Sequence, residues 1–115
     1  MEIKFKNIII ADDVKICKDI FSRSKGLRFS KPLKKGRAVL FISPEESCLH
    51  TSLDMFFVFF SVDIIWLNSG KEIVDIRRNV KPFTPIIRPK KPAKYVIEIP
   101  ANSSGLLKIG NKLKF

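Results

Sequence analysis

Cysteine and histidine are scarce in this 115-residue chain, which has two Cys and one His. Cys17 and Cys48 lie far apart, and neither has a second Cys or a His at the spacing of zinc ligands or of a C-x-x-C redox pair. His50 alone cannot build a His-based metal cluster, and no Ser-His-Asp arrangement has independent support. We therefore expect free, buried thiols, no metal and no cofactor. A disulfide between Cys17 and Cys48 would need an oxidising compartment or the cytosol of a hyperthermophile.

Long apolar runs are also few. The longest, residues 53–67, is shorter than the roughly 20 residues of a membrane helix and contains Asp54 and Asp63. The N-terminal residues 1–6 alternate in charge instead of forming the continuous apolar stretch of a secretory signal. These features predict a cytoplasmic protein without a membrane span.

Acidic residues are half as common as basic ones, with 11 Asp and Glu against 22 Lys and Arg, for a net charge of +11. Such an excess attracts nucleic acids, anionic surfaces or acidic partners. It equally fits a codon bias or the charge-rich surface of a heat-adapted organism. The length, with 45% hydrophobic and 29% charged residues, predicts a single globular domain over residues 1–115, as a monomer or weak oligomer.

Most of the chain has β-strand character. Alternating or continuous apolar segments rich in Ile, Val and Phe predict about eight short strands. They cover residues 3–10, 14–17, 38–42, 53–60, 62–67, 73–78, 95–99 and 112–115. The strand at 3–10 is expected to become fully buried at its end, and Trp66 and the Phe cluster of residues 56–60 are core candidates.

Local signals mark the connections. Asp19 is a helix cap and Gly26 a helix end, so one short helix is expected near residues 19–25. The turn residues 68–71 predict an antiparallel hairpin between residues 64–67 and 73–78. Ser43-Pro44 is expected to stop a strand, and residues 102–105 to begin a helical turn. Without a β-α-β alternation, the pattern favours a mainly β sandwich or partly open barrel.

A basic, Pro-rich loop follows the hairpin. Residues 82–92 contain four of the seven prolines, which excludes them from a central strand. Seven basic residues and no acid lie between positions 77 and 94: Arg77, Arg78, Lys81, Arg88, Lys90, Lys91 and Lys94. This segment is the best candidate for binding an anionic partner, although such loops are more often only solvated and rigid.

Two carboxylates lie inside apolar strands, Asp63 and Glu98, and buried carboxylates need partners. They could line a pocket, with Arg23 as a charge partner and a perturbed pKa. Alternatively, they form structural ion pairs or bond to the backbone. A Cys48/His50 pair is conceivable, but an incidental surface histidine is the simpler interpretation.

Five ordered segments resemble domain-of-unknown-function family 192, an uncharacterised family of small bacterial and archaeal proteins, in its archaeal-like form. They are Arg23-Ser24-Lys25-Gly26-Leu27, Leu53-Asp54-Met55-Phe56-Phe57, residues 61–67, residues 94–99 and Ile109-Gly110-Asn111. The resemblance implies a small, mainly β, jelly-roll-like fold with no established activity. The chain departs from the pattern at Arg28 (Met in the family), Asp54 (Trp or His), Ser61 (Pro) and Asn111 (Asp), which argues against catalysis at these positions.

Three functions remain open, and the ligand is unknown for each. A non-enzymatic binding or accessory module ranks first, and an enzyme with a carboxylate-lined site at Asp63 and Glu98 ranks second. Weak polyanion or nucleic-acid binding through residues 77–94 ranks third, because the aromatic and basic residues are segregated along the chain.

Overall fold

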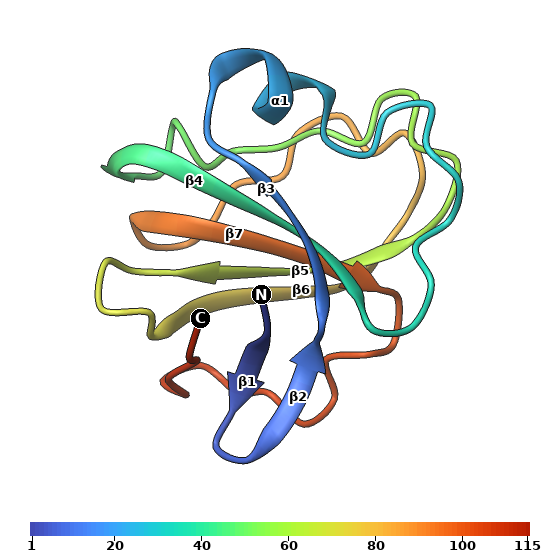
Figure 1. The fold of residues 1–115 in the computed structure, drawn as a ribbon. Helices are drawn as coiled ribbons and strands as arrows, with labels where there is room; N and C mark the ends of the chain where they lie inside the picture. The colour runs from blue at the N-terminus through green and yellow to red at the C-terminus, as the bar shows by residue number, and fades with distance from the viewer.

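Five strands form one mixed sheet, and two shorter strands form a hairpin that packs on it (Figure 1). The computed structural model describes residues 1–115, except for the side chains of Ile20 and Phe21. The elements are β1 (Ile3–Phe5), β2 (Ile8–Ala11), β3 (Asp13–Cys17), α1 (Ile20–Lys25), β4 (Arg37–Ser47), β5 (Val62–Leu67), β6 (Ile73–Val80) and β7 (Ala93–Pro100). The sheet order is β3-β4-β7-β5-β6. The predicted mainly β fold with one short helix is confirmed, and the two sheets do not close into a barrel.

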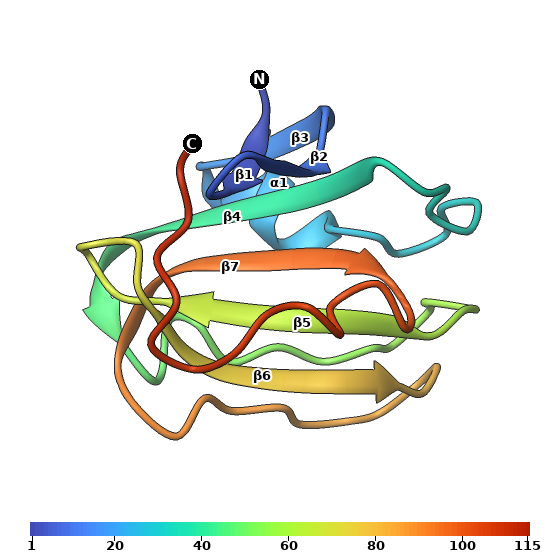
Figure 2. The same cartoon turned by 90° about the horizontal axis from the view of Figure 1, so that it is seen from below.

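The central sheet separates two apolar cores, because alternate residues of each strand point to opposite faces. Phe41, Trp66 and Val96 face the side of α1 and the long loops. Their neighbours Leu40, Ile65 and Ile97 face β1, β2 and the C-terminal segment. Figure 2 shows this arrangement from below, with β7 between β4 and β5.

The helix has the limits that its local sequence predicts. Asp19 Oδ1 accepts a hydrogen bond from Ser22 N at 2.7 Å and caps the first turn. Gly26 ends the helix with φ 45°, and its N–H donates to Ser22 O at 3.0 Å. A Cβ at Gly26 would lie 3.0 Å from Phe41 Cζ, so the close contact with β4 also favours glycine.

The helix belongs to a β-α-β unit, which the sequence pattern did not predict. β3 and β4 run parallel, with Cys17 beside Phe41 in the register, and α1 lies in the connection between them. Parallel strands need a crossover of about a dozen residues or more. Because the helix in this crossover has only six residues, its periodicity is too short to indicate the unit.

The predicted strand at residues 53–60 is wrong. This segment is a loop, joined to residue 87 by a single bridge at Leu53. Phe57 has φ 58°, which is incompatible with a strand. Met55 and Val58 are buried, but Phe56, Phe57 and Phe59 are exposed, so most of the predicted Phe core lies at the surface.

Several strand limits also differ from the prediction. The expected strand at 3–10 is the β1–β2 hairpin, and Ile8 and Ile9 are exposed instead of buried. β4 continues past Pro44 to Ser47, because a register shift between Ile42 and Ser47 removes the proline from the ladder. Residues 102–105 form turns, and residues 112–115 contribute only isolated bridges.

The other local predictions are confirmed. β5 and β6 form the expected antiparallel hairpin, and Asn68 Oδ1 accepts hydrogen bonds from Gly70 N and Glu72 N at 3.0 Å. Residues 82–92 form a loop, and Trp66 is fully buried. In the part of the chain that the structure describes, no helix has the length and apolar character to cross a membrane.

Candidate functional site

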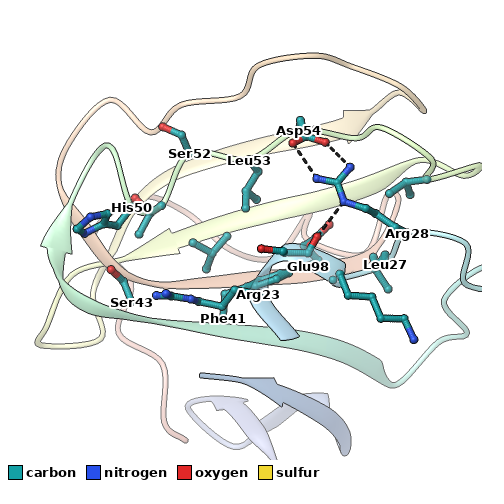
Figure 3. A pocket seen from close by; sticks show the side chains of 16 residues that line it. Arg23, Leu27, Arg28, Phe41, Ser43, His50, Ser52, Leu53, Asp54 and Glu98 are labelled. Carbon is teal, nitrogen blue, oxygen red and sulfur yellow. Dashed lines mark hydrogen bonds and ion pairs between the residues drawn. The ribbon is translucent and has the colours of Figure 1, made fainter. Parts of the chain in front are cut away.

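A cavity of about 300 Å³ opens on the face of the sheet that α1 covers (Figure 3). Its walls come from residues 23–28, from β4 and β7, and from the loop at residues 50–58. Polar or charged side chains around it include Arg23, Arg28, Ser43, His50, Asp54 and Glu98. Residues from three distant parts of the sequence therefore meet at one site.

Glu98 is the buried carboxyl group of this cavity. It lies in the middle of β7, between Val39 of β4 and Ile64 of β5, and shares the cavity face with Val96. Glu98 is 5% exposed, and its side chain forms no hydrogen bond or ion pair with any of the described residues. Burial raises the pKa of Glu98 to about 7, although the charge of Arg28 opposes the shift.

Arg23 reaches the same cavity from α1. Its side chain is half-buried and, within the described part of the chain, makes no hydrogen bond or ion pair. In the view of Figure 3, Arg23 extends past Phe41 toward Ser43, and Glu98 lies between this group and Arg28. The sequence suggested Arg23 as the charge partner of Glu98, but the arginine whose charge lowers the pKa of Glu98 is Arg28.

Arg28 and Asp54 form an ion pair at the cavity rim. Arg28 Nη1 lies 2.7 Å from Asp54 Oδ1, and Arg28 Nη2 donates to Asp54 Oδ2 at 2.9 Å. Arg28 also donates to the carbonyl oxygens of Ser24 and Phe56, both at 2.8 Å. Burial acts to raise the pKa of Asp54, but Arg28 and the N–H of Phe56 outweigh it and lower the pKa.

This pair was absent from the sequence predictions. Arg28 and Asp54 are two of the four positions that depart from the family pattern, and their charges are opposite. That joint departure is the only sequence signal that could have indicated the contact, because the two residues are 26 positions apart.

Asp63 does not line the cavity. It is fully buried in β5, where Oδ1 accepts hydrogen bonds from Asn79 N and Asn102 N at 2.8 and 3.1 Å. Its Oδ2 accepts from the N–H and the hydroxyl group of Ser104 at 3.0 and 2.6 Å. Burial favours a higher pKa, but these four donors lower the pKa of Asp63. Asp63 and Glu98 therefore share no cavity, and the carboxylate of Asp63 joins the ends of β5 and β6 to the C-terminal segment.

The loop at residues 48–53 places His50, Thr51 and Ser52 beside the cavity. Thr51 O accepts a hydrogen bond from the buried indole N–H of Trp66 at 2.8 Å, which holds this loop on the sheet. His50 is exposed at the rim, and its Nδ1 lies 3.4 Å from Glu45 Oε1. Cys17 is buried and Cys48 only half-buried; both thiols are free, and neither residue lines the cavity.

The seven basic residues of the Pro-rich segment do not line the cavity either. Arg78 donates to Ser104 Oγ, Ser104 O and Leu107 O at 2.7 to 3.2 Å, which ties the C-terminal segment to β6. Arg77 donates to Arg88 O, and Lys94 to Pro44 O. The side chains of Lys81, Arg88, Lys90 and Lys91 are exposed. Within the described residues, no group of three His, Cys, Asp or Glu side chains could hold a metal ion.

Comparisons with known proteins place the chain among uncharacterised relatives. A UPF0127 protein of Pyrococcus horikoshii is 35% identical over 112 residues, which cover 96% of this chain and 93% of that protein. A UPF0127 protein of Thermococcus sibiricus is 38% identical over 97 residues, and this chain spans only 60% of its length.

Two solved structures share the fold. A protein of unknown function from Novosphingobium aromaticivorans superposes with a TM-score of 0.81 at 20% identity, over 89% of this chain and 74% of that one. A putative transcription regulator from Sinorhizobium meliloti superposes with a TM-score of 0.82 at 23% identity, over 88% of this chain and 79% of that one. At such identities the likeness concerns the fold alone.

The sequence pattern of the DUF192 family, described as "Uncharacterized ACR", matches residues 2–115, which confirms the resemblance drawn from the five segments. The chain belongs to the DUF192 family.

Proposed function

We propose that this protein is a binding module and that a small polar molecule occupies the cavity beside Glu98. The observation that supports the proposal is the state of this carboxyl group, which is 5% exposed and faces the cavity without a protein partner among the described residues. Among the described residues no sealed side-chain oxygen or nitrogen lacks a hydrogen-bond partner, so the carboxyl oxygens of Glu98 are open to the cavity. A ligand in the cavity can therefore donate a hydrogen bond to Glu98.

The charges around the cavity narrow the ligand class. The half-buried guanidinium of Arg23 offers donors to an anionic group, whereas Glu98 requires a donor. A ligand that satisfies both has an acidic group and an N–H or O–H donor on one small body. The volume of about 300 Å³ is at the lower end of known ligand pockets, which fits a molecule of amino-acid size.

The experiment is a thermal-shift titration with a panel of α-amino acids and hydroxy acids, followed by calorimetry of any hit. A ligand of this class raises the melting temperature of the wild type, because it binds only the folded state. Glu98→Gln and Arg23→Gln should each remove the shift while they fold normally. Glu2→Gln, at an exposed site outside the cavity, is the matched control and should keep it. An unchanged shift in Glu98→Gln would contradict the proposal.

A second candidate is an enzyme that uses Glu98 for proton transfer. The pKa of about 7 supports this function, because a carboxyl group with that pKa can donate and accept protons near neutral pH. The two candidates differ in one measurement. In an enzyme, Glu98→Asp would keep part of the turnover of a bound ligand and Glu98→Gln would abolish it, whereas a binding module converts no ligand.

Weak polyanion binding through residues 77–94 remains the third candidate. Arg77, Arg78 and Lys94 already donate to backbone or side-chain oxygens, so fewer charges are free for a partner than the sequence count suggests. The free thiols of Cys17 and Cys48 fit a cytoplasmic location, and a monomer or weak oligomer is the expected state. These three statements remain predictions.

A further inference from the structure

Four phenylalanine rings gather at one end of the molecule, outside the cavity lining. Phe29 stacks on Phe57 with ring centroids 4.9 Å apart, and Phe83 meets the edges of Phe57 and Phe59 at 5.9 and 5.2 Å. They come from three loops, which follow α1, precede β5 and follow β6. Figure 2 shows these loops at the same end of the sheet, on the right. We call Phe29, Phe57, Phe59 and Phe83 the Phe patch.

The patch is exposed despite its size. Phe29 is 73% exposed, Phe57 48%, Phe59 61% and Phe83 42%. Single exposed apolar residues are common on proteins, but a contiguous aromatic cluster usually marks an interaction site.

The backbone holds these rings at an energetic cost. Phe29, Phe57 and Phe83 have φ values of 57°, 58° and 60°, which bulky side chains rarely adopt. Hydrogen bonds join the loops, from Phe29 N to Phe57 O at 2.8 Å and from Phe83 N to Met55 O at 2.9 Å. Strained positions that the surrounding structure maintains are typical of functional sites, so the patch is pre-formed.

The loop that precedes β5 contains one acidic residue, Asp54, and the segments around the rings carry none. Residues 27–35, 55–61 and 81–88 contain no Asp or Glu. Arg28 is paired with Asp54, but the side chains of Lys31, Lys34, Lys35, Lys81 and Arg88 are exposed. Lys31 and Lys81 are each two positions from a ring of the patch. Apolar rings flanked by lysines complement a surface that is apolar inside and negative at its boundary.

We propose that the Phe patch docks the protein on an anionic lipid bilayer. The rings enter the boundary between headgroups and acyl chains, and the flanking lysines contact the acidic headgroups. Because the patch is built from three loop tips, it fits a deformable lipid surface, which needs no complementary shape. The rings already contact one another, which leaves fewer ring faces for stacking nucleic-acid bases than separate aromatics would offer. This docking is independent of the ligand proposed for the cavity.

The test is co-sedimentation of the full chain with vesicles. Vesicles of equal parts phosphatidylglycerol and phosphatidylcholine should bind the wild type at low salt, and pure phosphatidylcholine should bind it much less. The double variant Phe29→Asn/Phe57→Asn suits the left-handed backbone better than phenylalanine, so it should melt no earlier than the wild type. This variant should nevertheless bind the anionic vesicles about tenfold more weakly than the wild type does. Lys31→Gln and Lys81→Gln should each weaken binding about fivefold.

Leu49→Asn/Ile109→Asn is the matched control, because it removes two exposed aliphatic side chains that lie outside residues 27–35, 55–61 and 81–88. It should bind anionic vesicles like the wild type. The proposal is overturned if the wild type stays in the supernatant, or if the folded Phe variant sediments normally. A dimer or an oligonucleotide complex that depends on the patch, without vesicle binding, would assign it to another partner and equally overturn the proposal.

Discussion

At the scale of single residues, Arg28 and Asp54 stand where the family pattern has apolar, aromatic or histidine side chains, and they pair with each other. The side chains are 29% exposed, and the guanidinium group meets both carboxylate oxygens. The strength of such a bidentate, partly desolvated ion pair lies between that of a weak surface pair and that of a buried pair. The two departures therefore compensate each other.

We expect the pair to be energetically coupled. Arg28→Met and Asp54→Asn should each lower the free energy of unfolding by about 1 to 2 kcal/mol, because each leaves a half-buried partner unpaired. The double variant should lose about 1 kcal/mol less than the sum of the two single losses. Urea unfolding of the four proteins measures this coupling. The exposed pair Asp13 and Arg37 should give a smaller coupling.

Glu98 makes stability depend on pH in an unusual direction. Its pKa in the folded protein is about 7, above the ordinary value of 4.5, so the folded state binds its proton more tightly than the unfolded state. This contribution is fully present below pH 4.5 and is lost as the pH rises through about 7. The pKa values of Asp54 and Asp63 are lowered, so their contributions are lost only as the pH falls below 3.8. The pH range in which Glu98 loses its contribution therefore does not overlap the range in which Asp54 and Asp63 lose theirs.

We therefore expect Glu98→Gln to flatten the pH profile. The free energy of unfolding of the wild type should fall by a few kcal/mol between about pH 4.5 and pH 7, and the variant should lose most of this slope. The variant should be the more stable protein above neutral pH. Urea unfolding across this range measures the slope, and equal slopes in the two proteins would rule out a raised pKa.

At the scale of elements, the predictions succeeded where the signal was local. The turn at residues 68–71 determines the β5–β6 hairpin through Asn68, whose side chain binds two N–H groups of the same turn. The helix limits at Asp19 and Gly26 are equally local. The strand predicted at residues 53–60 was wrong because apolar composition cannot show that β7 and β6 already flank β5.

Asp63 connects three elements, and we expect its substitution to unfold the protein more easily. Asp63→Asn replaces one acceptor oxygen with an amide that faces N–H donors, so the free energy of unfolding should fall by about 2 to 4 kcal/mol. Glu98→Gln should not destabilise the protein, because Glu98 has no such donors in the described structure. Thermal unfolding of both variants near neutral pH checks this. A wild-type melting temperature for Asp63→Asn would show that its four hydrogen bonds contribute little.

At the scale of the whole molecule, the parallel pairing of β3 with β4 and the cavity were the least predictable features. Residues as distant as Arg23, Asp54 and Glu98 reach one cavity only because the crossover places α1 over β4 and β7. The sequence indicated Glu98 as a carboxylate inside an apolar strand and Arg23 as a candidate charge partner. It could not indicate whether Asp63 or Glu98 faces a cavity, since this depends on contacts between segments far apart in the chain.

The net charge of +11 also acts at this scale, and its effect can be separated from that of a defined basic site. If polyanion binding depends only on net charge, Lys90→Gln/Lys91→Gln and Lys15→Gln/Lys18→Gln should weaken heparin binding equally, because all four lysines are exposed. A site at residues 77–94 predicts a loss only for the first pair, with a shallower dependence of affinity on salt by about one unit of slope for each lost contact. We expect equal losses, because Arg77, Arg78 and Lys94 are already engaged within the protein. Fluorescence titration at several salt concentrations distinguishes the two outcomes.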